Sequence, residues 1–144
     1  MRNEPGLVVD SETRRAIEAL TTEYSWLVDH GHADRAADLF TSDAVMSVAG
    51  SEVSGIVAIR RHLEQRAHNQ DILSRHIVSN IRLTREDADQ VRGTIIMTIY
   101  RKIGEAERPQ VIIGDVDDVY RLEKDGRWRL AQRKLTPAFV IDGL

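Results

Sequence analysis

The feature that most constrains the fold is a run of four extended segments in the second half of the chain, from Ser74 to Leu135. Apolar and polar residues alternate along these segments, which is the pattern of β-strands. Short polar stretches rich in turn-forming residues separate the segments, which cover residues 74–84, 90–103, 109–122 and 127–135. Because parallel neighbours need crossovers of a dozen or more residues, such short connections predict an antiparallel meander.

The alternation also assigns residues to faces of the predicted sheet. In the first segment, one face carries Ile77, Ile81 and Leu83, and the other carries His76, Val78, Asn80 and Arg82. In the second, Val91, Ile95, Met97 and Ile99 oppose Thr94, Ile96, Thr98 and Tyr100. Both faces are partly apolar, so we expect helices to cover one face and a second subunit to cover the other. The covered outer face is expected to include Ile95, Met97, Ile113 or their neighbours, in a homo-oligomer that is a dimer rather than a trimer.

The first half of the chain predicts three helices and a short hairpin. Residues 1–10 are expected to form a flexible arm, and Ser11 to cap a first helix that ends near Gly31. Its apolar stripe consists of Ile17, Leu20, Tyr24, Leu27 and Val28. A short second helix has Ala33, Ala36, Ala37 and Phe40 on its inner side and is broken at residues 41–43. A hairpin of residues 44–48 and 52–54 follows, and then a third helix from Gly55 to about His68.

Helices gathered on one side of a curved antiparallel sheet define an α+β domain. A strongly twisted sheet with helices across its concave side leaves a conical space between the two layers. A small apolar molecule is the ligand that such a space suits.

Composition excludes several classes of protein. The 144 residues suit one domain spanning 1–144, and the net charge of −3 comes from interspersed charges, which argues against nucleic acid or an anionic membrane as a partner. The chain has no cysteine, so it offers no disulfide, thiolate metal site or cysteine nucleophile. This composition suits the reducing cytoplasm. We therefore expect a cytoplasmic protein without a signal peptide or a membrane span, which would need about 20 apolar residues.

His76 and Asp29 are the first candidates for chemistry. Histidine titrates near neutral pH, and a partner on the strand face that His76 shares with Val78 and Asn80 would fix its tautomer. The alternative is a core histidine bonded to a backbone carbonyl. A regular helix would point Asp29 away from the apolar stripe. Asp29 reaches a pocket only if another part of the chain covers that helix end or if the helix loosens there. The alternative is an aspartate that faces water.

The remaining histidines give no metal site. His30 and His32 flank Gly31, but adjacent turn residues seldom converge on one ion, and the chain has no HExxH spacing. We expect both to be exposed turn histidines. His62 and His68 lie about 120° apart around the axis of the third predicted helix, so they do not share a ligand.

Two charged residues lie on apolar strand faces. Asp118 falls with Ile112, Val116, Tyr120 and Leu122, and the alternative is a bulge that turns it outward. Arg133 shares a face with Ala131 and Leu135, where it either closes the far end of a pocket or pairs with an acid on the neighbouring strand. The sequence contains no glycine-rich phosphate loop, no GxSxG elbow and no nucleotide fingerprint.

Five stretches, taken in order and spacing, resemble the SnoaL-like superfamily, whose cone-shaped α+β barrel fold is shared with nuclear transport factor 2. They are YSWLVD at 24–29, HADRAADLFTSDA at 32–44, GIVAI at 55–59, RHIVSN at 75–80 and DGRWRL at 125–130. The resemblance covers about residues 11–137. It implies three N-terminal helices packed on a strongly curved antiparallel sheet.

Within this superfamily the chain is most similar to the branch that includes scytalone dehydratase and hexachlorocyclohexane dehydrochlorinase. Those enzymes use an aspartate at the end of the first helix to orient a histidine on the first long strand, and the matching residues here are Asp29 and His76. The dehydratase has a further histidine on the next long strand. No histidine follows His76 in this chain, and Tyr100 or Arg101 occupies that region.

The resemblance implies a cofactor-independent lyase or isomerase that performs dehydratase-like elimination or proton transfer on a small, largely apolar molecule. It requires no metal and places the protein in polyketide or aromatic-compound metabolism. His76 would be the base and Asp29 its orienter, while the expected substrate-binding residues are Tyr24, Tyr100, Arg133 and Asp118. The alternative is a non-catalytic ligand-binding protein or an assembly subunit, like the small subunits of ring-hydroxylating dioxygenases, because the fold does not need the dyad.

Overall fold

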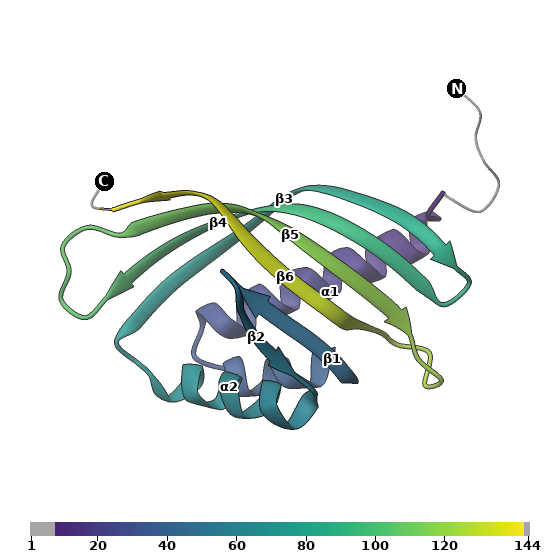
Figure 1. Cartoon of the computed structure of the whole chain (residues 1–144), viewed down its shortest axis with the longest axis horizontal. Helices are drawn as coiled ribbons and strands as arrows, with labels where there is room; N and C mark the ends of the chain where they lie inside the picture. The colour runs from purple at the N-terminus through teal and green to yellow at the C-terminus, as the bar shows by residue number, and fades with distance from the viewer. Residues whose placement is uncertain (1–7, 143–144) are drawn as a thin grey trace.

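The computed structural model describes residues 8–142, which form three helices and six strands. In chain order these are α1 (Ser11–Asp29), the 3-10 helix η1 (Ala33–Leu39), β1 (Phe40–Val48), β2 (Ser51–Ser54), α2 (Ile56–His68), β3 (Ile72–Asp87), β4 (Gln90–Ile103), β5 (Gln110–Leu122) and β6 (Trp128–Ile141). The long strands curl over α1, and α2 lies on the same concave side together with the β1–β2 hairpin (Figure 1). The predicted α+β architecture is confirmed.

Helix α1 begins at Ser11, so its N-cap is the residue before Ser11 and not Ser11 itself, as was predicted. The cap is Asp10, whose Oδ1 accepts a hydrogen bond from the backbone N–H of Thr13 at 2.7 Å. A carboxylate is well suited to this position because it satisfies an unpaired N–H and faces the positive end of the helix dipole. The helix runs to Asp29 as predicted, and Gly31 has a φ of +82°, which favours glycine.

The boundary between the second helix and the first strand differs from the prediction. Residues 40–43 were assigned to the end of a helix and its break, but η1 stops at Leu39 and β1 already begins at Phe40. Phe40 pairs with Leu130 of β6, and both Phe40 and Thr41 are buried. Pairing with a strand ninety residues away therefore extends β1 beyond what the local pattern indicates.

The sheet has the order β2-β1-β6-β5-β4-β3. Strands β3 to β6 form the predicted antiparallel meander. However, β1 pairs with β6 in parallel, so the sheet is mixed rather than purely antiparallel. It is also curled but unclosed, with β2 and β3 as its edges, where the prediction was a barrel. Short turns indicate pairing only between consecutive strands, so they do not predict the β1–β6 pair, whose strands are far apart in sequence.

Strand β3 changes face halfway along its length, which the predicted alternation misses. Ser79 pairs with Ile96 and Arg82 with Thr94, so two residues of β3 oppose one residue of β4, and Asn80 adopts a φ of +52°. This is a β-bulge. Before it, the even-numbered His76 and Val78 face inward and Ile77 is 50% exposed. After it, the odd-numbered residues face inward, so Ile81 packs on the same apolar cluster as Val78.

The outer sheet face carries different residues from those expected. Ile95 and Met97 are buried on the inner face, at 1% and 3% exposure, so they do not form an outer surface. Strand register instead lines up Ile77, Thr98, Ile113 and Phe139 across four strands. Ile77 and Phe139 are exposed, as are Leu73, Ile96, Tyr100, Ile103, Val140 and Ile141. The assignment was wrong at Ile95 and Met97 because both faces of β4 are apolar and the period alone does not show which is inside.

The predicted N-terminal arm falls mostly on residues 1–7, which lie outside the described part of the chain. Asp10, at its end, is held against the domain by Thr13 and by an ion pair with Arg85 at 3.3 Å. No helix within residues 8–142 combines the length and the apolar character needed to cross a membrane.

Candidate active site

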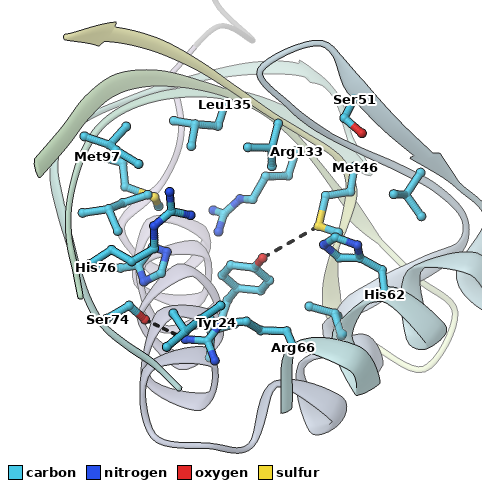
Figure 2. Close-up of a pocket in the computed structure, with 18 of the residues that line it drawn as sticks. Tyr24, Met46, Ser51, His62, Arg66, Ser74, His76, Met97, Arg133 and Leu135 are labelled. Carbon is cyan, nitrogen blue, oxygen red and sulfur yellow. Dashed lines mark hydrogen bonds between the residues drawn. The ribbon is translucent and has the colours of Figure 1, made fainter. Parts of the chain in front are cut away.

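The concave side of the sheet encloses a cavity of about 450 Å³. Its wall is mainly apolar and includes Val28, Leu63, Ile72, Met97, Ile99 and Val116. Val48, Ser51 and Gln65 line it and are also exposed, so the cavity opens to solvent between β2 and α2. Polar side chains from several elements point into this space (Figure 2). The volume falls within the range of about 300–1,000 Å³ that is typical of small-molecule pockets.

Asp29 and His76 meet at this wall. Asp29 ends α1, and its Oδ1 lies 2.6 Å from Nδ1 of His76. The same carboxylate accepts hydrogen bonds from the backbone N–H of His76 at 2.6 Å and from the hydroxyl of Ser74 at 2.7 Å. The helix stays regular to Asp29. Asp29 reaches the cavity wall because β3 covers this end of the helix, and not because the helix loosens there. The His76 ring lines the cavity, and Asp29 lies behind it.

The carboxylate of Asp29 is ionised in this environment. Burial by itself raises the pKa of Asp29, but the hydrogen bonds from His76 and Ser74 outweigh burial and bring the pKa below its ordinary value of 3.8. Because a carboxylate only accepts hydrogen bonds, Nδ1 of His76 must carry a proton to face it. The Nε2 atom is then the nitrogen that presents a lone pair when the ring is neutral.

A second buried carboxylate holds Arg133. Asp118 is 0% exposed and accepts two hydrogen bonds from the guanidinium, from Nε at 3.0 Å and from Nη2 at 2.7 Å. The hydroxyl of Tyr120 donates to the same carboxylate at 2.5 Å. Burial alone would lower the pKa of Arg133, but the attraction of Asp118 raises it, so the guanidinium keeps its charge. Its Nη1 atom is buried and has no hydrogen-bond partner within the described chain.

Tyr24 lies in the centre of the cavity, with the guanidinium of Arg133 over its ring at 4.7 Å from the centroid (Figure 2). Its hydroxyl contacts Sδ of Met46 at 3.7 Å, which is a weak acceptor. Burial raises the pKa of Tyr24, so the phenol stays protonated near neutral pH. The site therefore offers one O–H donor and one guanidinium close to each other.

Three further residues of the site were not identified from the sequence. Arg66 of α2 donates a hydrogen bond from Nη2 to Oγ of Ser74 at 3.0 Å, and both line the cavity. Arg101 of β4 lines it as well and pairs in register with Ser74. Arg101 shares its strand face with Met97 and Ile99, which the structure shows to be buried, but the sequence alone does not indicate that this face is the inner one.

Tyr100, an expected substrate-binding residue, does not reach the cavity. It points to the outer face and is 41% exposed, because its neighbour Arg101 has the inward parity. Of the other histidines, His30 and His32 are exposed as predicted, and His62 lines the cavity while His68 does not. Residues 8–142 contain no group of three or more His, Cys, Asp or Glu side chains that is placed to hold a metal ion.

The curled sheet with helices on its concave side is an α+β fold of the cystatin-like or nuclear-transport-factor-like type. Residues 9–134 match the family model of the SnoaL-like domain. The chain belongs to this family.

Solved structures share the fold along nearly the whole chain. A scytalone dehydratase-like protein from Novosphingobium aromaticivorans superposes with a TM-score of 0.81 and 23% identity, covering 91% of this chain and 87% of the other. A hexachlorocyclohexane dehydrochlorinase (LinA, type 2) gives a TM-score of 0.79 and 20% identity, with coverage of 90% and 88%. ActVI-ORFA from Streptomyces coelicolor gives 0.76 and 17%, with coverage of 89% and 98%. At these identities the likeness shows the fold. No curated protein matches the chain.

Proposed function

We propose that this protein is a cofactor-independent lyase or isomerase that removes a proton from carbon in a small, largely apolar molecule. The observation that carries the proposal is the 2.6 Å contact between Asp29 and the Nδ1 atom of His76, whose ring lines the largely apolar cavity. An aspartate that holds an imidazole in one tautomer and stabilises the imidazolium is an established arrangement for a general base.

The reaction begins with Nε2 of His76 accepting a proton from a carbon of the bound molecule. The electron pair of that C–H bond stays on the substrate, and Asp29 offsets the positive charge that forms on the imidazole. In an elimination, the pair expels a leaving group from the adjacent carbon and forms a double bond. In an isomerisation, the pair delocalises, and the imidazolium returns the proton to a different carbon.

In this proposal, Arg133 and Tyr24 stabilise the anion that develops on the substrate. Nη1 of Arg133 is a buried donor without a partner in the described chain, and the hydroxyl of Tyr24 has only a thioether as its acceptor. Donors that are fixed in advance at the site of developing charge lower the barrier without reorganising during the reaction. Asp118 in this scheme is a positioning residue, because it binds the guanidinium rather than the substrate.

The proposal can be tested before the substrate is known, by following exchange of carbon-bound protons with solvent. The protein is incubated in D₂O with a library of small molecules that carry acidic C–H bonds, and deuterium uptake is measured by mass spectrometry. Wild-type protein should label at least one compound. His76→Ala should abolish the labelling, and Asp29→Asn should slow it by about 10²–10⁴-fold, the usual contribution of a positioned base.

His68→Ala is the matched control, because His68 lies exposed on α2, outside the cavity, and should not alter the rate. Labelling that persists in His76→Ala would refute the assigned base. Wild-type protein that binds members of the library but labels none of them would favour the non-catalytic alternative.

A further inference from the structure

We propose that the substrate is an organic monoanion whose carboxylate binds between Arg66 and Arg101, with the apolar part of the molecule filling the rest of the cavity. This inference rests on the proposed function and adds the chemical class of the ligand. Its basis is an imbalance of charge within the cavity wall, together with donors that lack acceptors.

The cavity lining is basic. It contains Arg66, Arg101 and Arg133 together with His62 and His76, and none of the lining residues, all within the described chain, is Asp or Glu. Two carboxylates lie behind this wall. Asp118 binds Arg133, and Asp29 binds His76 and Ser74. Three arginines against two carboxylates leave one positive charge in excess even when both histidines are neutral.

Arg66 and Arg101 differ from Arg133 in the partners they make. Arg133 is held by two hydrogen bonds to a carboxylate, whereas Arg66 contacts the hydroxyl of Ser74 at 3.0 Å and Arg101 contacts Oε1 of Gln110 at 2.6 Å. Both of these acceptors are neutral. The Nε atom of Arg101 is buried and has no partner among the described residues. A buried donor without an acceptor is unfavourable, and a bound ligand oxygen would satisfy it.

Arg66 and Arg101 are both tied to the position of Ser74, and they lie close enough for Arg101 to lower the pKa of Arg66. Arg66 reaches the side chain of Ser74 from α2, and Arg101 pairs with Ser74 across the β3–β4 ladder. Burial lowers the pKa of Arg66, repulsion from Arg101 lowers it further, and Asp29 opposes both effects. Like charges at such a site repel each other until an anion is bound, and guanidinium groups match the geometry of a carboxylate.

This placement also sets the distance between the anion and the base. Ser74 and His76 are two residues apart on the inward face of β3, which separates them by about 7 Å along the strand. A carboxylate bound beside Ser74 would therefore bring a carbon a few bonds away next to Nε2 of His76. The remaining wall around Ile99 and Ile112 is apolar and suits a hydrocarbon or aromatic body.

The experiment compares carboxylates with their neutral amides of the same shape. The binding of benzoate, cinnamate and 1-naphthoate, and of the three matching amides, is measured by calorimetry with the full chain in a low-chloride buffer. At least one carboxylate should bind ten times more tightly than its amide. Arg101→Gln and Arg66→Gln should each reduce that preference about tenfold, and Arg101→Lys should retain part of it because it keeps the charge.

Arg82→Gln is the control, because Arg82 is exposed on β3 and should leave the preference unchanged. Circular dichroism of each variant shows whether it is folded. Equal affinities for every carboxylate and its amide would overturn the inference, and so would a preference that survives in both Arg66→Gln and Arg101→Gln. The result is separable from the proposed function, because His76→Ala should keep the preference for carboxylates while losing proton exchange.

Discussion

Replacing Asp29 by asparagine should reverse the tautomer of His76. The wild-type carboxylate accepts three hydrogen bonds, two at Oδ1 and one at Oδ2. Asparagine has one oxygen, and this oxygen must face the backbone N–H of His76, which has no other way to be satisfied. The amide NH₂ group then takes the place of Oδ1. It meets Nδ1 of His76, which can accept a hydrogen bond only if the proton moves to Nε2.

The cost in stability follows from the same three bonds. Hydrogen bonds to a charged group contribute about 1.5–3 kcal/mol, and neutral ones about 0.5–1.5 kcal/mol. Three bonds are weakened, and the loss is partly offset because a neutral amide is cheaper to bury than a carboxylate. We expect Asp29→Asn to lower the free energy of unfolding by about 1–3 kcal/mol and to leave the fold intact.

The assay is long-range ¹H–¹⁵N NMR of the imidazole rings at a pH where they are neutral. Wild-type His76 should show a protonated Nδ1, and the variant a protonated Nε2. His30 and His68 are internal standards, because their Nδ1 atoms lie 2.7 Å and 2.8 Å from backbone carbonyl oxygens and should remain protonated in both proteins. The same tautomer of His76 in both proteins would refute the reasoning.

The pH dependence of stability gives a further check on the charge of Asp29. Its pKa in the folded state lies below its ordinary value of 3.8. The ionised carboxylate therefore stabilises the folded state above about pH 4, and this stabilisation is lost as the pH falls through the lowered pKa. The difference in unfolding free energy between wild type and Asp29→Asn, measured in urea, should shrink as the pH falls below about 4.

Two other features give simpler tests. Gly114→Ala would place a Cβ atom 2.6 Å from the backbone oxygen of Thr136, so urea unfolding should show a loss of about 1–3 kcal/mol, whereas alanine at the exposed Thr94 should cost less than about 0.5 kcal/mol. The exposed apolar row that includes Ile77 and Phe139 predicts a homodimer, which light scattering should detect at micromolar concentration and which Ile77→Lys should dissociate. A stable monomer of the wild type would contradict the second prediction.

Much of the fold was predictable because long stretches of its strands follow a period of two. The second long strand illustrates this, since Ile95, Met97 and Ile99 share one face in both sequence and structure. The parallel pairing of β1 with β6 was not predictable in this way, because a contact between segments so far apart leaves no local pattern. The mixed and unclosed sheet is a consequence of that contact.

The sequence indicated those residues of the candidate site whose type or position is unusual. His76 and Asp29 stood out by chemistry, and Asp118 and Arg133 stood out as charges on apolar strand faces. Arg66 and Arg101 did not, because arginines are common at the surface and the alternation of β4 does not show which of its faces is inside. Tyr100 lies on the face of β4 opposite Ile95 and Met97, so the wrong assignment of the outer face at those two residues also made Tyr100 an expected site residue.

The bulge at Asn80 reconciles two requirements on β3 that a regular strand does not meet together. His76 must face inward to reach Asp29, and Ile81, five residues later, must face inward to join the core. An extra residue between them supplies the change of parity, at a φ of +52° that costs most residues about 1–2 kcal/mol and asparagine less. Asn80→Gly should therefore be neutral or stabilising in urea unfolding, and Asn80→Val should destabilise by at least about 1 kcal/mol. If the valine variant is as stable as wild type, residue 80 does not set the bulge, and the inward position of His76 must depend on its bonds to Asp29 alone.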